Sequence, residues 1–366
     1  MPDYAIAFAA DDTPDALAEA CASELATAKG HTVGFIYVTD RIAAAYPEIL
    51  ARLKKRTGIE TWVGTVGLGI CATGQTCFGK PGIAAMTARW RPDAVQLLPS
   101  LDRESDVAEL DEPAFLASLG IVHADPRNAH TFRIVSALSE RFGTFLVGGL
   151  TAGRSAFPQV SGEVTEGGVS GLLLGGNLGV VAGLSQGCSP IGPTHRITRG
   201  SGNVLMTLDD MPALEVLREE VGVADGADIL PWLGDVHVAL PVSGHDAGDY
   251  LVRNLAGIDP KHDAVVIAER ISAGDRITFV RRNAESALKD IDRMLTDLKA
   301  RSTAPPKAGL YFSCCARGPN LFDNEQQELD AIRDALGDIP LVGFFGNGEI
   351  SHDRIYGYTG VLALFT

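Results

Sequence analysis

Residues 312–318 read FSCCARG and residues 340–350 read PLVGFFGNGEI, with an acidic segment between them. The pattern predicts an apolar strand, a polar turn, an amphipathic helix, a second apolar strand and a glycine turn. This order is typical of an open α/β sheet, in which ligands bind at the carboxyl ends of the strands. We therefore expect the two strand ends of this stretch to carry functional side chains.

Four polar residues at those strand ends are candidates for ligand contacts. Cys314 supplies a soft nucleophile and Arg317 a fixed cation, while Asn347 and Glu349 follow the second strand. The alternative is that Cys314 is a buried structural residue, because free cysteine is among the most buried residue types. The two opposite charges beside glycine turns favour binding, since charged groups are rare at the ends of core strands unless they pair or bind something.

The rest of the chain alternates predicted strands and helices, which indicates an α/β fold with mixed sheets. A Val-Gly pair, with a second glycine five residues after the first, recurs within residues 63–69, 147–153 and 342–348. This echo favours two related α/β halves that arose by duplication, although Val-Gly pairs also occur by chance at strand ends. We place the two domains at residues 1–200 and 201–366, with a ligand cleft between or beside them.

The charge and composition of the chain exclude several classes of partner. Its net charge of −15 and pI near 4.9 argue against sequence-independent nucleic-acid binding and against docking on anionic lipid. No stretch reaches the roughly 18 apolar residues of a membrane span, so we expect no membrane insertion. The six cysteines include no Cys-x-x-Cys pair and no secretory segment opens the chain, so we expect free thiols and a cytoplasmic protein.

Three further motifs supply candidate residues. Residues 148–155, GGLTAGRS, approach a phosphate-binding loop, but Arg154 stands where that loop requires lysine and no helix is expected to follow. Residues 186–193, QGCSPIGP, predict a rigid turn that presents Gln186 and Cys188, or a structural crossover between domains. We expect this turn or Arg154 to form a cleft wall facing Cys314. His195 begins a strand and is our candidate for an axial haem ligand, although a lone histidine is far more often an ordinary residue.

These segments together resemble the FIST family, named for F-box and intracellular signal transduction proteins, with its FIST N and FIST C domains. Residues 314–318 are similar to the family's Cys-x-x-Arg-Gly motif, and residues 343–350 to its Gly-Phe…Gly-Glu-Ile turn. Residues 186–193 resemble its Gln-Gly…Pro-Ile-Gly-Pro linker. The amino-terminal half departs from the family's Gly-x-Ser-x-x-Gly-Glu-Ile pattern, because it has Thr65, Val66 and no glutamate there.

The resemblance implies a stand-alone sensory protein that binds a small molecule, such as an amino acid. Some bacterial members of the family bind haem, sense nitric oxide and act on a partner histidine kinase. This chain shows no kinase, cyclase or F-box region, so its output is expected to pass through a partner.

A different class of function is an enzyme that uses Cys314 as its nucleophile. Arg317 would favour the thiolate, but the local sequence offers no base, and a catalytic cysteine normally needs one. A third hypothesis is a haem-based gas sensor with His195 or a cysteine thiolate as the iron ligand. We expect a binding protein rather than an enzyme.

Overall fold

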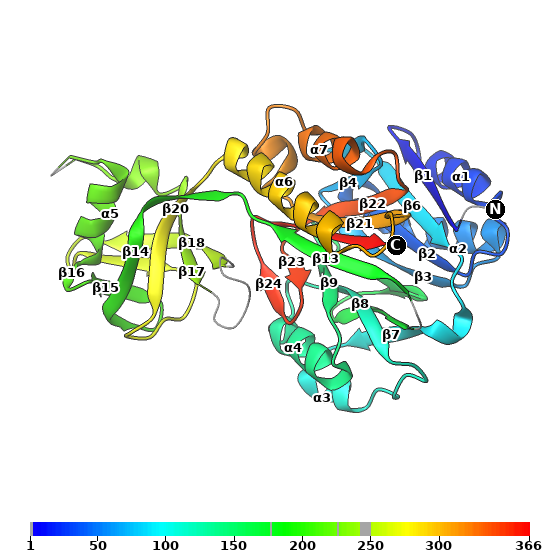
Figure 1. The fold of residues 1–366 in the computed structure, drawn as a ribbon, viewed down its shortest axis with the longest axis horizontal. Coiled ribbons are helices and arrows are strands. Elements are labelled where there is room, and N and C mark those ends of the chain that lie inside the picture. The colour runs from blue at the N-terminus through cyan, green and yellow to red at the C-terminus, as the bar shows by residue number, and fades with distance from the viewer. Residues whose placement is uncertain (1–2, 176–177, 225–226, 242–249) are drawn as a thin grey trace. The chain divides into compact units, whose positions relative to one another are not determined.

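The computed structural model describes residues 3–175, 178–224, 227–241 and 250–366. It has the expected mixed α/β fold (Figure 1). Contacts divide the chain into two compact units: unit 1 is Met1–Gln186 with Leu288–Thr366, and unit 2 is Gly187–Ala287. The predicted domain boundary after residue 200 falls inside unit 2. The division into domains 1–200 and 201–366 stays a prediction.

Unit 1 contains three copies of one arrangement, which we call repeats A, B and C. Repeat A consists of β1 (Tyr4–Ala10), α1 (Pro14–Leu25), β2 (Val33–Thr39), η1 (Asp40–Ala45), α2 (Tyr46–Thr57), β3 (Thr61–Gly67), β4 (Gly69–Ala72), β5 (Gln75–Phe78) and β6 (Gly82–Ala88). Repeat B consists of η2 (Pro92–Ala94), β7 (Val95–Leu101), α3 (Glu104–Ala108), β8 (Ala117–Ala124), α4 (Thr131–Phe142), β9 (Leu146–Leu150), β10 (Gln159–Ser161), β11 (Glu163–Thr165) and β12 (Val169–Gly175). Repeat C consists of β13 (Val180–Ser185), α6 (Ala284–Arg301), β21 (Ala308–Cys314), η4 (Gly318–Asn320), α7 (Gln327–Leu336), β22 (Leu341–Gly346), β23 (Glu349–Ser351), β24 (Arg354–Tyr356) and β25 (Gly360–Phe365).

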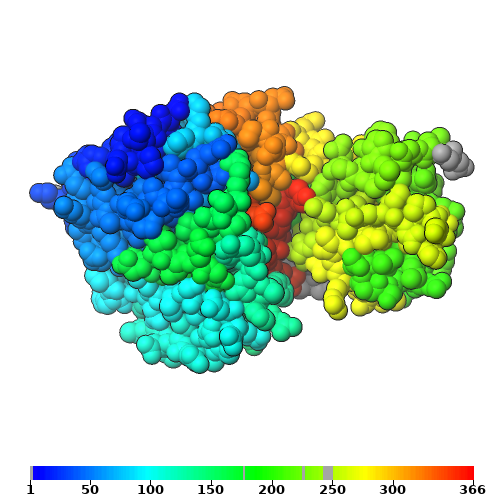
Figure 2. All heavy atoms as spheres, turned by 180° about the vertical axis from the view of Figure 1, so that it is seen from behind, coloured from blue at the N-terminus to red at the C-terminus, as the bar shows by residue number. Residues whose placement is uncertain are grey.

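Each repeat builds one six-stranded sheet, and the three sheets have the same strand order. In repeat A the order is β1-β6-β2-β3, followed by the hairpin β10-β11 from repeat B. In the same way β23-β24 of repeat C joins the sheet of repeat B, and β4-β5 of repeat A joins the sheet of repeat C. The exchange of hairpins is therefore cyclic, and the expected duplication extends to three copies that meet as blue, cyan-to-green and orange-to-red regions of unit 1 (Figure 2).

One glycine is required at the same place in every repeat. Gly64, Gly148 and Gly343 each lie in the second of two parallel strands. A Cβ atom on these glycines would lie 1.7, 1.8 and 1.6 Å, respectively, from the carbonyl oxygen of the residue paired with each. No side chain fits at such a distance, so the Val-Gly echo of the sequence marks a close approach of neighbouring strands.

The turns that follow these glycines are joined in a ring. Each bond joins two repeats. The donor is the backbone amide of the residue four positions after the required glycine of one repeat. The acceptor is the carbonyl of the residue two positions after the required glycine of another repeat. The three bonds are Ala152 N to Val66 O at 3.0 Å, Asn347 N to Leu150 O at 3.0 Å, and Leu68 N to Phe345 O at 3.1 Å. We call this set the turn ring, and it brings the three glycine turns together at one end of unit 1.

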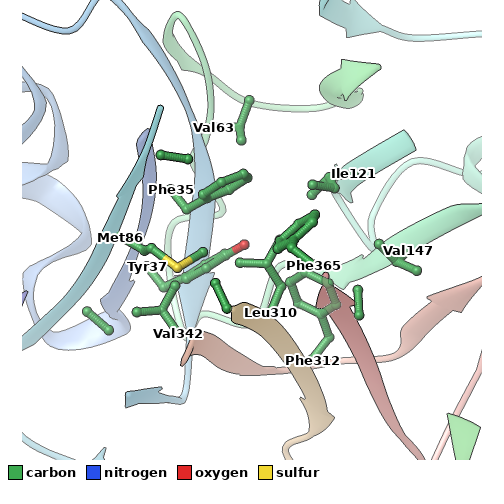
Figure 3. Packing of buried hydrophobic residues seen from close by; sticks show 14 of the residues in the cluster. Phe35, Tyr37, Val63, Met86, Ile121, Val147, Leu310, Phe312, Val342 and Phe365 are labelled. Carbon is green, nitrogen blue, oxygen red and sulfur yellow. The ribbon is translucent and has the colours of Figure 1, made fainter. Parts of the chain in front are cut away.

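The core of unit 1 is shared by all three sheets. Their inner faces meet around an approximate threefold axis, where Phe35, Ile121 and Leu310 occupy equivalent positions on β2, β8 and β21 (Figure 3). Their outer faces are covered in pairs by α1 with α2, α3 with α4, and α6 with α7. Burial of both faces explains why the central strands read as almost continuous apolar runs.

Unit 2 is a closed antiparallel barrel. Six strands pair in the cyclic order β14, β20, β17, β18, β19, β15 and back to β14, with β16 beside β15 and α5 packed on the barrel core. The bounds in this unit are β14 (Cys188–Ser201), β15 (Val204–Leu208), β16 (Met211–Pro212), α5 (Ala213–Val221), η3 (Leu230–Trp232), β17 (Val236–Pro241), β18 (Tyr250–Asp259), β19 (Ala264–Ile267) and β20 (Arg276–Arg282). Closure leaves no free sheet edge among these six strands.

Replacing the glycine of repeat C tests the close strand approach. Gly343→Ala places a methyl group against a backbone carbonyl, so we expect the free energy of unfolding in urea to fall by about 3 kcal/mol or more. Gly357→Ala is the matched control, because no atom lies within 4 Å of a Cβ there. A loss at Gly343 no larger than that of the control would show that the strands separate without cost.

Candidate functional site

The carboxyl ends of the three parallel strand pairs form the candidate site of unit 1. Thr39, Asp125 and Cys314 occupy equivalent positions there, each three residues beyond the strand partner of a required glycine. All three side chains are buried, and the turn ring lies at this same end. Three repeats thus bring three different polar groups to one end of the axis.

Cys314 and Glu349 lie together in repeat C, as the sequence predicts. The Glu349 side chain is fully buried, its Oε2 atom accepts from the amide and the hydroxyl of Thr359, and its Oε1 atom has no described partner. Burial, followed by the neighbouring Cys314, raises the pKa of Glu349 well above its ordinary value. The hydrogen bond to Cys315, followed by burial, raises the pKa of Cys314 well above its ordinary value. Both shifts favour the uncharged form of the group.

Arg317 is held by a partner that the sequence analysis missed. Its Nε atom donates to Oε2 of Glu328 on α7 at 3.0 Å, and both side chains are buried. Tyr311 and Ser313 donate to the same carboxylate, and Arg317 Nη2 donates to Ser185 Oγ. Burial by itself lowers the pKa of Arg317, but Glu328, Tyr311 and Glu349 together outweigh it, and the net shift is upward. Arg317 is thus a permanent buried cation that positions β21 against α7.

Asn347 and Arg154 lie in the turns themselves. The Asn347 side chain is exposed while its backbone belongs to the turn ring. Arg154, from repeat B, pairs at 2.5 Å with Asp40, which directly follows Thr39 in repeat A. The Asp40 carboxylate is almost fully buried and its Oδ1 atom has no described partner, whereas Arg154 is more than half exposed.

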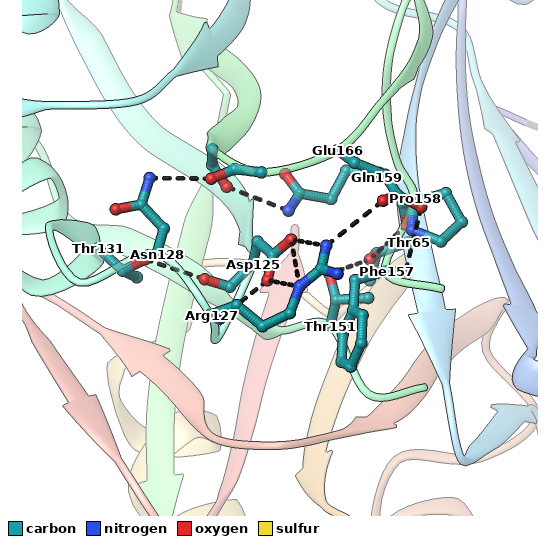
Figure 4. Close-up of polar contacts among 12 residues, drawn as sticks. Thr65, Asp125, Arg127, Asn128, Thr131, Thr151, Phe157, Pro158, Gln159 and Glu166 are labelled. Carbon is teal, nitrogen blue, oxygen red and sulfur yellow. Dashed lines mark hydrogen bonds and ion pairs between the residues drawn. The ribbon is translucent and has the colours of Figure 1, made fainter. Parts of the chain in front are cut away.

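A second arginine–aspartate pair caps the end of β8 (Figure 4). Arg127 Nε donates to both oxygens of the buried Asp125, and Arg127 Nη2 also donates to Glu166. Burial raises the pKa of Asp125, but the hydrogen bonds from Arg127 outweigh it and the net shift is downward. The Arg127 guanidinium lies 4.3 Å from the ring centre of Phe157 and is half exposed. Two buried carboxylates at this end are therefore each covered by an exposed arginine.

Beneath these groups, the next layer of the axis contains two polar side chains without partners. Tyr37, His123 and Phe312 occupy equivalent positions, and their ring centres are 5.6, 6.1 and 6.2 Å apart. Both ring nitrogens of His123 lack a described hydrogen-bond partner, and so does the hydroxyl of Tyr37. Burial lowers the pKa of His123 to about 3, so its ring is neutral. Such orphaned groups each cost about 1–3 kcal/mol.

The remaining predicted residues are Gln186, which follows β13 at the end level with the carboxyl end of β21, and Cys188 in unit 2. The Gln186 backbone amide donates to Asp290 at 2.6 Å, and the Gln186 side chain is buried. Cys188 is buried on β14 of unit 2, where its carbonyl accepts from Tyr250. Neither residue is shown to face Cys314.

His195 does not fit as a haem ligand. Its Nδ1 atom lies 2.7 Å from Asp209 and its Nε2 atom 2.6 Å from Glu220, so both ring nitrogens face carboxylates. Burial lowers the pKa of His195, but these carboxylates outweigh it and the net shift is upward, which favours the imidazolium. The raised pKa of Cys314 favours the thiol over the thiolate that would bind haem iron. Among the described residues, no group of three metal-ligating side chains occurs.

Comparison with known proteins identifies the family of the chain. The FIST N domain matches residues 32–211 and the FIST C domain matches residues 213–352. The chain belongs to the FIST family. An uncharacterized protein of Mycobacterium tuberculosis is 31% identical over 339 residues, which cover 87% of both chains. An uncharacterized protein of Mycobacterium bovis is 33% identical over 239 residues, 61% of both chains.

Membership places this FIST protein among sensory and signal-transduction proteins. The two family matches meet near residue 212, inside unit 2, so the FIST C match combines most of the barrel with the part of repeat C that runs from α6 to β23. None of the helices in the described ranges is long and apolar enough to cross a membrane.

A substitution at His123 tests whether its two buried nitrogens lack hydrogen-bond partners. His123→Phe copies the residue of repeat C, and we expect it to raise the free energy of unfolding at pH 7 by about 1–3 kcal/mol, because it removes two unpaired nitrogens. The wild type also loses stability as pH falls from about 6.5 towards 3, since only the unfolded histidine binds a proton there. The gain should therefore grow as the pH is lowered.

The control for His123→Phe is Thr144→Val, which removes another orphaned buried group that does not titrate. Urea unfolding of both variants at pH 7 and pH 5 measures the difference. A His123→Phe gain that does not depend on pH, or no gain at all, would contradict a buried neutral His123.

Glu349 gives the opposite dependence on pH. Because its pKa is raised on folding, the folded protein holds a proton that the unfolded chain releases, so stability falls as pH rises above the ordinary pKa of glutamate. Glu349→Gln removes this titration. We expect the variant to gain on the wild type by up to about 1.4 kcal/mol per pH unit until Glu349 ionises in the folded state. If the free energies of unfolding of the wild type and Glu349→Gln change in parallel from pH 5 to 8, Glu349 is ionised in the folded protein.

Proposed function

We propose that this FIST protein is a sensory protein that binds a small amino-acid-like molecule at the carboxyl ends of the three strand pairs in unit 1. The observation that carries the proposal is the turn ring, which gathers polar groups of three repeats over one end of the axis. Ligands of α/β sheets collect at such strand ends, because backbone amides and side chains converge there.

The two arginine–aspartate pairs match the charges of such a ligand. Arg154 and Arg127 are more than half and about half exposed, so each can offer a ligand carboxylate the N–H groups that its buried aspartate does not use. Asp40 has an unpaired oxygen that can accept from an ammonium group. Asn347 adds an exposed amide from the third repeat.

Cys314 and Glu349 supply the neutral part of the proposed site. Glu349, which interacts with Cys314, carries the unpaired Oε1 atom, and its raised pKa favours a protonated carboxyl group that can both donate and accept a hydrogen bond. Arg317 does not contact the ligand in this proposal; its ion pair with Glu328 holds β21 in place. We place Gln186 and Cys188 outside the contacts on which the proposal rests.

The output of the protein is proposed to pass to a signalling partner such as a histidine kinase. A ligand that reorders the turn ring would change the surface formed by all three repeats, which a partner can read. A haem sensor and a Cys314 enzyme are weaker alternatives, because His195 is paired with two carboxylates and the Cys314 thiol is not activated.

Titration calorimetry with the protein amino acids, their decarboxylated amines and their des-amino acids tests the proposal. We expect Arg154→Gln to weaken binding of carboxylate-bearing compounds by about tenfold or more and to leave the amines unchanged. Arg133→Gln, an exposed change on α4, is the control. No binding by the wild type, or equal affinities for the two variants, would contradict the proposed site.

A further inference from the structure

A hollow of unit 1 lies at the end of the central strands opposite the turn ring. It opens to the surface, has a volume of about 520 Å³, and is lined by residues that follow β6 and precede β8. Because β6 runs antiparallel to β2, and β12 antiparallel to β8, these residues lie at the amino-terminal ends of β2 and β8. The turn ring is at the carboxyl ends. The volume is within the range of about 300–1,000 Å³ that is usual for small-molecule sites.

The walls of this hollow are apolar and aromatic. Trp90 is almost fully buried, and its Nε1 atom donates to the hydroxyl of Tyr4, which fixes the indole. Phe115 packs directly on Gly175, where a Cβ would lie 1.9 Å from the ring. Leu174 completes the apolar wall. These groups offer a surface for hydrocarbon or an aromatic ring.

Charged groups on the same hollow favour an anion. Arg89 and Arg91 both line it, against a single carboxylate, Asp93. Arg91 is 81% exposed and its pair with Asp93 is a surface pair between neighbouring residues, which is easily exchanged. One Arg89 nitrogen donates to the carbonyl of Lys29, and a guanidinium carries five N–H donors. In a chain of net charge −15, a site with two arginines and one aspartate is a local exception.

We propose that this hollow binds a small amphipathic anion, with an apolar body against Trp90 and Phe115 and a carboxylate or similar group on Arg89 and Arg91. The inference does not depend on the amino-acid-like ligand of the turn ring, because the two sites share no residue. It gives unit 1 a second site at the opposite end of its axis.

Titration calorimetry of the full chain with octanoate, octanol and octylamine tests this inference. Octanoate is expected to bind, and the double variant Arg89→Gln, Arg91→Gln to weaken it by at least about tenfold, the loss expected when hydrogen bonds to a charged group are removed. Gly175→Ala forces the Phe115 ring, which lines the hollow, to shift without any change of charge, and is expected to weaken octanoate binding similarly. Arg133→Gln is the control and should bind like the wild type.

Each outcome decides the inference. Preference of the wild type for octanoate over both other probes, with octanoate affinity reduced in the arginine and Gly175 variants while the circular dichroism spectrum is unchanged, supports it. Equal binding of octanoate and octanol, tighter binding of octylamine, no binding by the wild type, or octanoate affinity unchanged in the arginine variant would overturn it.

Discussion

The close approach of parallel strands at three glycines is the constraint on which unit 1 depends. Where Gly64, Gly148 and Gly343 lie, a neighbouring carbonyl occupies the space of a side chain. The strands can then run close enough for the following turns to reach another repeat, and three backbone hydrogen bonds close the turn ring. The turn after each of these strands leads the chain into another sheet, where the exchanged hairpin pairs.

A threefold backbone with different side chains explains the chemistry of the axis. Equivalent positions hold Thr39, Asp125 and Cys314 in one layer, and Tyr37, His123 and Phe312 in the next. The backbone needs only that these layers fill space, and Phe312 shows that hydrocarbon suffices. Polar groups in the other two repeats reduce stability without supporting the fold, which is the usual relation between a scaffold and a site built on it.

Much of unit 1 could be predicted from local sequence, whereas the site could not be completed. The strands and the Val-Gly echo follow from apolar runs and glycine spacing, and Cys314 and Glu349 come together because they follow adjacent parallel strands. Glu328 was missed because a glutamate on an amphipathic helix ordinarily faces water, and only the tertiary fold brings Arg317 to it. Asp125 carried one usable signal, since it directly follows a strand, in the position equivalent to Cys314.

Native-state hydrogen exchange at the amides of Leu68, Ala152 and Asn347 tests most directly whether three repeats form one site. If the turn ring is a single element, the three amides open with the same free energy, and a mixture of the protein amino acids changes the protection of all three together. Opening free energies that differ widely between the repeats, or a change in protection confined to one turn, would contradict the account.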